Sequence, residues 1–133
     1  PAMVLPASMR LRGHRCFDHL HRRGKRFHGT LMVLRKASSN PKLLRRDTVG
    51  ISELGQPKSC RIAVVISGKV HKRAVVRNRL RRLLHDHLRT RFEARPEHGQ
   101  CWLLISLRPG ADAGEANLLE ECDRLLEQAG LQP

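Results

Sequence analysis

The chain has 133 residues, with 26 Lys and Arg against 12 Asp and Glu, which leaves a formal net charge of +14. This length suits one domain, over residues 1–133, with a single hydrophobic core. The excess charge predicts an anionic partner, either nucleic acid or an acidic membrane surface. The basic segments contain no Trp or Tyr to anchor them in lipid, and no apolar stretch approaches a membrane span. We therefore expect a cytoplasmic protein with no membrane partner.

The four cysteines are widely separated, without a C-x-x-C pair or a spacing typical of zinc ligands. A disulfide would need an oxidising compartment, which nothing else in the sequence indicates. We expect Cys16, Cys60, Cys101 and Cys122 to be reduced and mostly buried, and we expect no bound metal.

The first predicted element is a helix over residues 13–23. Cys16, Phe17 and Leu20 share one face of it. Gly24 follows at the position where a glycine in the left-handed conformation commonly ends a helix.

The next segment, residues 26–35, contains an apolar run of four residues flanked by charge, and we predict a single β-strand there. Residues 37–59 are rich in Gly, Pro, Ser and charged residues, and we predict a long mobile loop. A further strand around residues 49–51 is left open. The segment of residues 61–67 is short and rich in β-branched residues, which predicts a strand. This strand leads into a basic helix and places that helix at a sheet edge.

A helix is predicted over Ala74–Phe92, because apolar residues recur from Val76 at i+4, i+7, i+8 and i+12. Stepping 100° per residue places the cations on the opposite arc, which does not mix charge signs as an ordinary solvated face does. The planar fork of Arg suits phosphate contacts, so we favour nucleic acid as the partner. The arc comprises Asn78, Arg79, Arg81, Arg82, His85 and Arg89, with Arg77 at its border.

The C-terminal third begins with a turn at residues 95–99, and then a strand over Cys101–Leu107 is apolar throughout, as a strand buried on both faces would be. Asp112 and Glu115 have the D-x-x-E spacing of a capping box before a helix that Gly130 ends. This helix is the acidic one, with Glu115, Glu120, Glu121, Asp123 and Glu127, and we expect it to cover the sheet away from the nucleic acid. The predicted order is α-β-β-α-β-α.

Catalytic chemistry is not predicted for this chain. The carboxylates of its acidic C-terminal helix are spaced around the solvent side instead of forming a pair, its histidines are dispersed, and it contains no nucleophile or phosphate-loop motif. We assign no catalytic residue and no metal ligand, and we expect the chain to bind without breaking bonds.

The basic segment resembles the RNR signature of the bacterial ribonuclease P protein subunit. The matching residues are Arg77-Asn78-Arg79-Leu80-Arg81-Arg82, preceded by Ser67-Gly68-Lys69 and Lys72-Arg73-Ala74. The first helix and the last strand also resemble the family, so the likeness covers the chain from about Leu11 onward. It implies an α/β (α+β) two-layer sandwich of ribosomal-protein type, in which the RNR helix lies in a left-handed β-α-β crossover, an exception to the usual right-handed rule.

The resemblance also implies a function. The family binds a large catalytic RNA, ribonuclease P RNA, and the 5′ leader of precursor tRNA, and the RNA with bound Mg²⁺ removes the leader. It implies an endoribonuclease subunit that binds no cofactor itself and has no obligatory protein partner. The implied RNA-binding residues are Lys69, Lys72, Arg73, Arg77, Asn78, Arg79, Arg81 and Arg82, to which the arc adds His85 and Arg89.

Leader contacts are implied for Phe17 and for His21, which stands where the family commonly has a second aromatic residue. Core packing is an equally favoured interpretation of Phe17. The chain departs from the family in having Gly68 in place of a usual Lys and Arg73 in place of a frequent Gly.

Three other functions are weighed against these sequence features. A structural RNA-binding protein of ribosomal type, with no role in cleavage, is the main alternative. A DNA-binding helix would need base-reading side chains on the arc, where this chain has mostly Arg. An independent nuclease would need converging carboxylates.

Overall fold

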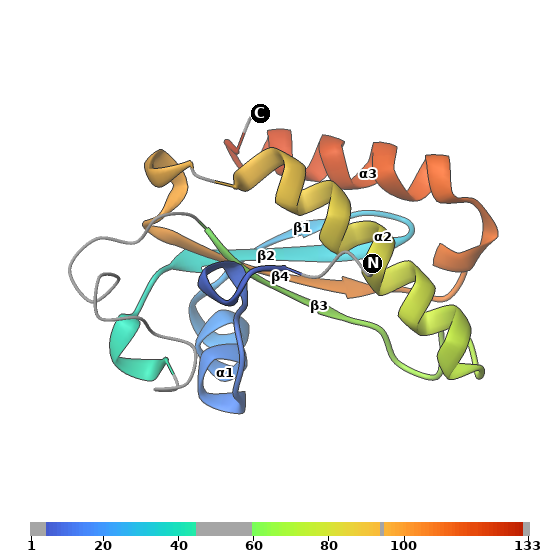
Figure 1. The fold of residues 1–133 in the computed structure, drawn as a ribbon, viewed down its shortest axis with the longest axis horizontal. Helices are drawn as coiled ribbons and strands as arrows, with labels where there is room; N and C mark the ends of the chain where they lie inside the picture. Colours follow the sequence, from blue (N-terminus) through green and yellow to red (C-terminus); the bar gives the residue numbers. More distant parts are fainter. Residues whose placement is uncertain (1–4, 45–59, 94, 132–133) are drawn as a thin grey trace.

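The computed structural model describes residues 5–44, 60–93 and 95–131. Its helices and strands follow the predicted order, apart from one additional strand (Figure 1). They are α1 (His14–Arg23), β1 (Lys25–His28), β2 (Met32–Ser38), β3 (Arg61–Val65), α2 (Ala74–Phe92), β4 (Cys101–Leu107) and α3 (Glu115–Gln128). Short 3-10 helices lie at Ala7–Met9, Pro41–Leu43, Pro96–His98 and Ala111–Ala113. The predicted helix over Ala74–Phe92 and the strand over Cys101–Leu107 are confirmed to the residue.

The strands form one mixed sheet in the order β1-β2-β4-β3. β2 runs antiparallel to β1 and β4, whereas β3 runs parallel to β4 and is joined to it through α2. β3 is an edge strand, as predicted, and the N-terminal segment adds one parallel bridge to it, between Arg10 and Ile62. The basic helix is therefore the connection of a β-α-β unit at one edge of the sheet.

Helices cover both faces of the sheet (Figure 1). On one face, Leu103 and Ile105 of β4 belong to the large core shared with α2 and α3. On the other face, Trp102 and Leu104 pack with Cys16 and Leu20 of α1. This alternation is what a strand buried on both faces requires. The α/β class is confirmed, but the two-layer prediction left out α1 on the second face.

The acidic helix α3 was predicted to cover the sheet away from the nucleic acid; it covers the same face of the sheet as α2, and on which side a nucleic acid binds stays a prediction. The two helices lie side by side there. Asp123 of α3 accepts a hydrogen bond from His87 Nε2 at 2.7 Å and pairs with Arg91 at 2.7 Å. These contacts join the two helices, and they explain why half-buried His87 lies at the border of the apolar stripe of α2.

The single strand predicted over residues 26–35 is instead a hairpin of β1 and β2. In its turn, Gly29 donates a hydrogen bond to the Met32 carbonyl at 2.8 Å. The Glu121 carboxylate accepts the next two backbone N–H groups, from Thr30 at 2.9 Å and Leu31 at 2.7 Å. A Cβ on Gly29 would lie 2.5 Å from the Glu121 carboxyl carbon, so a larger residue there would displace this carboxylate from the turn. Local patterning missed the hairpin because the group that stabilises its turn lies on a distant helix.

The predicted mobile loop over residues 37–59 begins too early. β2 continues through Ser38, and Pro41–Leu43 forms a 3-10 helix. Residues 45–59, including the open strand at 49–51, lie outside the described residues.

The predicted helix caps have mixed outcomes. Gly130 ends α3 in the left-handed conformation (φ 80°), as expected. Gly24 ends α1, as predicted, although its conformation is extended (φ −75°) and not left-handed. Glycine is needed there because a Cβ would meet the Leu20 carbonyl oxygen at 2.3 Å. The capping box is wrong, since Asp112 lies in a separate 3-10 turn and Gly114 is the N-cap of α3, with no side-chain cap.

The four cysteines are unbridged and buried, as predicted. Among the described residues, no helix is long and apolar enough to cross a membrane.

Candidate RNA interface

The buried stripe of α2 sets the direction in which its cations point. Leu80, Leu84, Leu88 and Phe92 are each at most 1% exposed and recur every fourth residue, which fixes one side of the helix against the sheet. The opposite side carries Asn78, Arg79 and Arg82 exposed to solvent, with Arg81, His85 and Arg89 half-buried along its borders. The structure therefore brings the predicted arc together on one surface.

Arg77 has a positioning role in this surface. Its half-buried guanidinium donates to the carbonyls of His71 and Lys72, both at 2.8 Å. These bonds hold the loop before α2 against the first turn of the helix. The loop carries Lys69, Lys72 and Arg73, all exposed, so Arg77 aligns these cations with the arc. Direct contact between Arg77 and an anion stays a prediction.

Asn78 organises the arginines that follow it. Its side-chain oxygen accepts a hydrogen bond from Arg81 Nη1 at 2.8 Å, and its carbonyl is 3.4 Å from Arg82 Nε. The Asn78 side chain thus restricts the Arg81 guanidinium, and the backbone of residue 78 restricts that of Arg82. Restricting them in advance reduces the side-chain entropy that an anion would have to remove on binding.

Two of the arginines on the predicted arc of α2 have acidic neighbours, in addition to Arg91, which pairs with Asp123. Arg89 Nε lies 3.0 Å from Glu93, and Arg79 lies 3.9 Å from Glu115 with both side chains more than half exposed. Exposed pairs of this kind contribute little free energy. Arg79 therefore remains available to an anion.

An open groove with a volume of about 240 Å³ lies where α2, α1 and the N-terminal segment meet β3. Phe17 of α1 lines it together with Arg81 and His85 of α2, whereas His21 is exposed and does not line it. Phe17 also packs, half-buried, against the core under α1, so its surroundings agree with both interpretations. Arg10 and Arg12, which were not among the predicted site residues, complete the cationic wall.

His85 in this groove is held neutral. Burial, followed by the charges of Arg81 and Arg10, lowers its pKa to about 4. Desolvation and like charges both disfavour the imidazolium. At pH 7 His85 can donate or accept a hydrogen bond but adds no positive charge.

We expect this shift to affect stability at acid pH. The folded pKa is below that of an unfolded histidine, so between about pH 6.5 and pH 4 the unfolded chain binds the additional proton and the fold loses stability as the pH falls. Above this window the contribution is complete. NMR titration should place the His85 midpoint near pH 4, and His85→Gln should flatten the stability profile between pH 6.5 and pH 4. A midpoint above pH 6 would contradict the described burial.

The sheet face beside α1 is only partly covered. The register places His28, Val33, Ser106 and Val65 in one row across all four strands, and Val65 is 38% exposed. This row points to the same side as α1, and no helix of the described residues covers it. An open, partly apolar surface therefore lies next to the groove.

Two arginines occupy the neighbouring row of this open face. Arg26 is exposed and pairs across the hairpin with half-buried Arg35. Burial and then the Arg26 charge lower the pKa of Arg35, and its Nε is buried without a hydrogen-bond partner among the described residues. An anion at this position would satisfy that donor. Sequence reasoning missed both residues because it treated the hairpin as one strand; strand alternation would otherwise have placed them together.

No group of three or more His, Cys, Asp or Glu side chains in the described part of the chain could hold a metal ion. The site consists of guanidinium and ammonium groups, one aromatic ring and a neutral imidazole. Such groups can bind phosphates and stack on bases.

Comparisons with known proteins agree on one family. Residues 5–130 match a family model described as Ribonuclease P. The chain is 84% identical over 131 residues to the ribonuclease P protein component of Synechococcus sp. (strain WH7803), covering 98% of this chain and 100% of the relative. It is 64% identical to the corresponding protein of Prochlorococcus marinus (strain MIT 9313), covering 97% and 98%.

Solved structures show the same fold at low identity. The Staphylococcus aureus RNase P protein has a TM-score of 0.70 at 13% identity, over 94% of this chain and 98% of that one. The Thermotoga maritima RNase P protein has a TM-score of 0.64 at 17% identity, over 90% and 96%. The family match over residues 5–130, together with these close relatives, shows that the chain belongs to the ribonuclease P protein family.

Proposed function

We propose that this chain is the protein subunit of ribonuclease P, and that its α2 surface docks onto the catalytic RNA. The observation that carries the proposal is the exposed face of α2, where Asn78 orders Arg81 and Arg82 and where Arg77 holds a further basic loop in line. Each cation that neutralises a phosphate releases condensed counterions, which favours binding and makes it depend on salt.

The precursor-tRNA leader would occupy the groove beside Phe17 and the open sheet face. Arg10, Arg12, Arg26 and Arg35 supply cations along this path. Phe17 supplies a phenyl ring in the groove, where stacking is worth about 1–3 kcal/mol per base. His21 lies one helical turn from Phe17 and would extend the contact beyond the groove.

Bond cleavage is assigned to the RNA. Mg²⁺ bound by the RNA would activate the attacking water and stabilise the leaving oxygen. The protein's residues bind and orient, and they screen the repulsion between leader and catalytic RNA, so that less Mg²⁺ is needed. The left-handed β-α-β crossover, the cytoplasmic location and the absence of an obligatory protein partner remain parts of this proposal.

Single-turnover cleavage of a precursor tRNA at low Mg²⁺ and moderate salt tests the function. A bacterial ribonuclease P RNA should cleave the 5′ leader much faster with this chain than without it. A chain that binds the RNA tightly but leaves the cleavage rate unchanged would support the alternative, a structural RNA-binding protein of ribosomal type.

Phe17→Leu should distinguish leader stacking from core packing. Leu keeps most of the buried volume but has no π-face. We expect about a 5- to 100-fold weaker affinity for precursor tRNA, corresponding to the loss of one stacked base, with unchanged affinity for mature tRNA. If Phe17→Leu lowers the thermal midpoint of unfolding and weakens the affinity for precursor and mature tRNA equally, Phe17 serves the core.

A further inference from the structure

Two thiols lie side by side where the parallel strands β3 and β4 begin. The Sγ atoms of Cys60 and Cys101 are 3.4 Å apart. The two residues stand one step before the Arg61–Trp102 pair in the parallel register. Neighbouring strands lie about 4.7–4.9 Å apart, within the Cα separation of roughly 4.4–6.8 Å that a disulfide spans. A bond between these sulfurs therefore requires side-chain rotation and little movement of the backbone.

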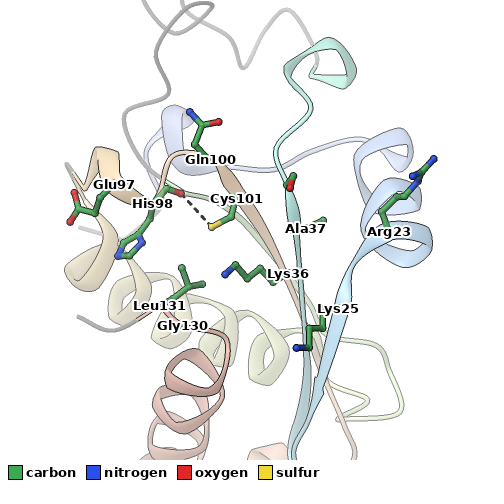
Figure 2. Close-up of a pocket in the computed structure, with 11 residues that line it drawn as sticks. Arg23, Lys25, Lys36, Ala37, Glu97, His98, Gln100, Cys101, Gly130 and Leu131 are labelled. Atoms are coloured by element: carbon green, nitrogen blue, oxygen red, sulfur yellow. Dashed lines mark hydrogen bonds between the residues drawn. The ribbon is translucent and has the colours of Figure 1, made fainter.

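Only one of the two thiols can be reached by a small molecule. Cys60 is fully buried, whereas Cys101 is 8% exposed and lines an open cavity of about 650 Å³ (Figure 2). His98 and Lys36 lie in the same cavity wall. Figure 2 shows the hydrogen bond from the Cys101 thiol to the His98 carbonyl, at 3.3 Å, with the Lys36 side chain extending into the same cavity.

The surroundings favour a thiolate on the accessible member. The hydrogen bond from Cys60 lowers the pKa of Cys101 more than burial raises it, and the Lys36 charge lowers it further. Burial holds the pKa of Cys60 well above its ordinary value. Cys101 is therefore the nucleophile, and Cys60, whose Sγ lies 3.4 Å from that of Cys101, is the resolving thiol.

The other two cysteines lack these features. Cys16 and Cys122 are both 0% exposed and have no neighbouring thiol among the described residues. Burial raises the pKa of Cys16, and it raises that of Cys122 to about 12. They serve as internal references for selective oxidation.

We propose that Cys60 and Cys101 form a modification site, a dithiol that hydroperoxides oxidise to a reversible disulfide through the cavity beside Cys101. The Cys101 thiolate attacks a peroxide oxygen and the O–O bond breaks, which leaves Cys101 as a sulfenic acid. The leaving hydroxide becomes water by taking up the proton that Cys101 released when it ionised. Cys60 then attacks that sulfur, the S–S bond forms, the S–O bond breaks, and the hydroxide leaves with the Cys60 proton. Two thiols and one hydrogen peroxide become one disulfide and two waters. A dithiol reductant reverses the reaction by exchange.

The test treats the reduced full-length chain with one equivalent of hydrogen peroxide, blocks remaining thiols with N-ethylmaleimide and maps the non-reduced digest by mass spectrometry. We expect a Cys60–Cys101 linked peptide at least tenfold more abundant than any other pairing, and we expect dithiothreitol to remove it. The Cys16→Ser, Cys122→Ser double variant should give the same product. In guanidinium chloride the preference should disappear, because it depends on the folded register.

Single variants test the order of the steps. Cys60→Ser should stop at a Cys101 sulfenic acid that dimedone traps, and Cys101→Ser should leave Cys60 unmodified. The proposal is overturned if Cys16 or Cys122 oxidises first, or if Cys101 oxidises to the sulfinic acid without forming the linked peptide. It is also overturned if Cys60 in the Cys101→Ser variant is oxidised as fast as Cys60 in the wild-type chain. Circular dichroism of each variant establishes that the comparison is made on folded protein.

Discussion

Changing Arg73, Arg79 and Arg82 together to Gln should weaken binding to ribonuclease P RNA by roughly 10²–10³-fold at low salt. These three residues are exposed on α2 and the loop before it, and none of them holds the fold together. Each lost phosphate contact removes about 0.7–0.9 from the slope of log affinity against log salt, so the slope should flatten by about 2–3. Filter binding across a salt series measures both quantities, and precursor-tRNA cleavage at low Mg²⁺ should fall in parallel.

The matched control removes the same charge elsewhere. Arg22, Lys42 and Arg124 are exposed on α1, the Pro41–Leu43 helix and α3, outside the proposed interface. Their joint change to Gln should reduce the affinity only a few-fold. Equal losses in the two triple variants would mean that net charge, and not the arranged surface of α2, determines binding.

Arg77 is left out of that variant because its role differs from that of its neighbours. Replacing it would release the carbonyls of His71 and Lys72 and move the loop that carries Lys69 and Arg73. A loss of affinity in Arg77→Gln would therefore combine a lost charge with a displaced loop. Arg77→Lys keeps the charge but lacks the planar guanidinium that donates to both carbonyls. The difference between these two variants therefore measures the positioning effect.

The elements that could be predicted are those whose signal is local. In α2, apolar residues recur with the helical period of 3.6, which shows which side of the helix is buried. In β4, the unbroken apolar run shows a strand buried on both faces. Both elements were therefore predicted to the residue. The hairpin of β1 and β2 has a weak pattern of its own, since β1 is mostly exposed. Its turn depends on Glu121, which no local window contains.

The candidate site divides in the same way. The arc of α2 could be read from helical periodicity, because its residues are neighbours in sequence. The groove could not, because it assembles Arg10, Phe17 and Arg81 from separate segments, and only the packing of α1 and α2 around β3 brings them together. The positioning role of Arg77 could not be predicted either, since periodicity gives a direction on the helix and not the hydrogen-bond acceptors beside it.

Changing Glu121 to Ala should cause a large loss of stability, about 2–4 kcal/mol in the free energy of unfolding. Its side chain is 7% exposed, and its carboxylate accepts the N–H groups of Thr30 and Leu31 and pairs with Arg124 at 3.3 Å. Hydrogen bonds to a charged group contribute about 1.5–3 kcal/mol each, and the two backbone donors of the turn would lose this acceptor. Urea unfolding measures the loss, and amide hydrogen exchange should rise first at Thr30 and Leu31.

The control for Glu121 is its exposed neighbour on the same helix. Glu120→Ala removes the same charge and raises helix propensity by the same amount, and it should change stability by less than about 0.5 kcal/mol. Glu121→Gln should fall between the two, because the amide oxygen can accept one N–H while the amide nitrogen faces the other donor. If Glu121→Ala and Glu120→Ala were equally stable, the hairpin would hold its turn without α3. The contact between α3 and the hairpin would then be a consequence of the fold and not one of its supports.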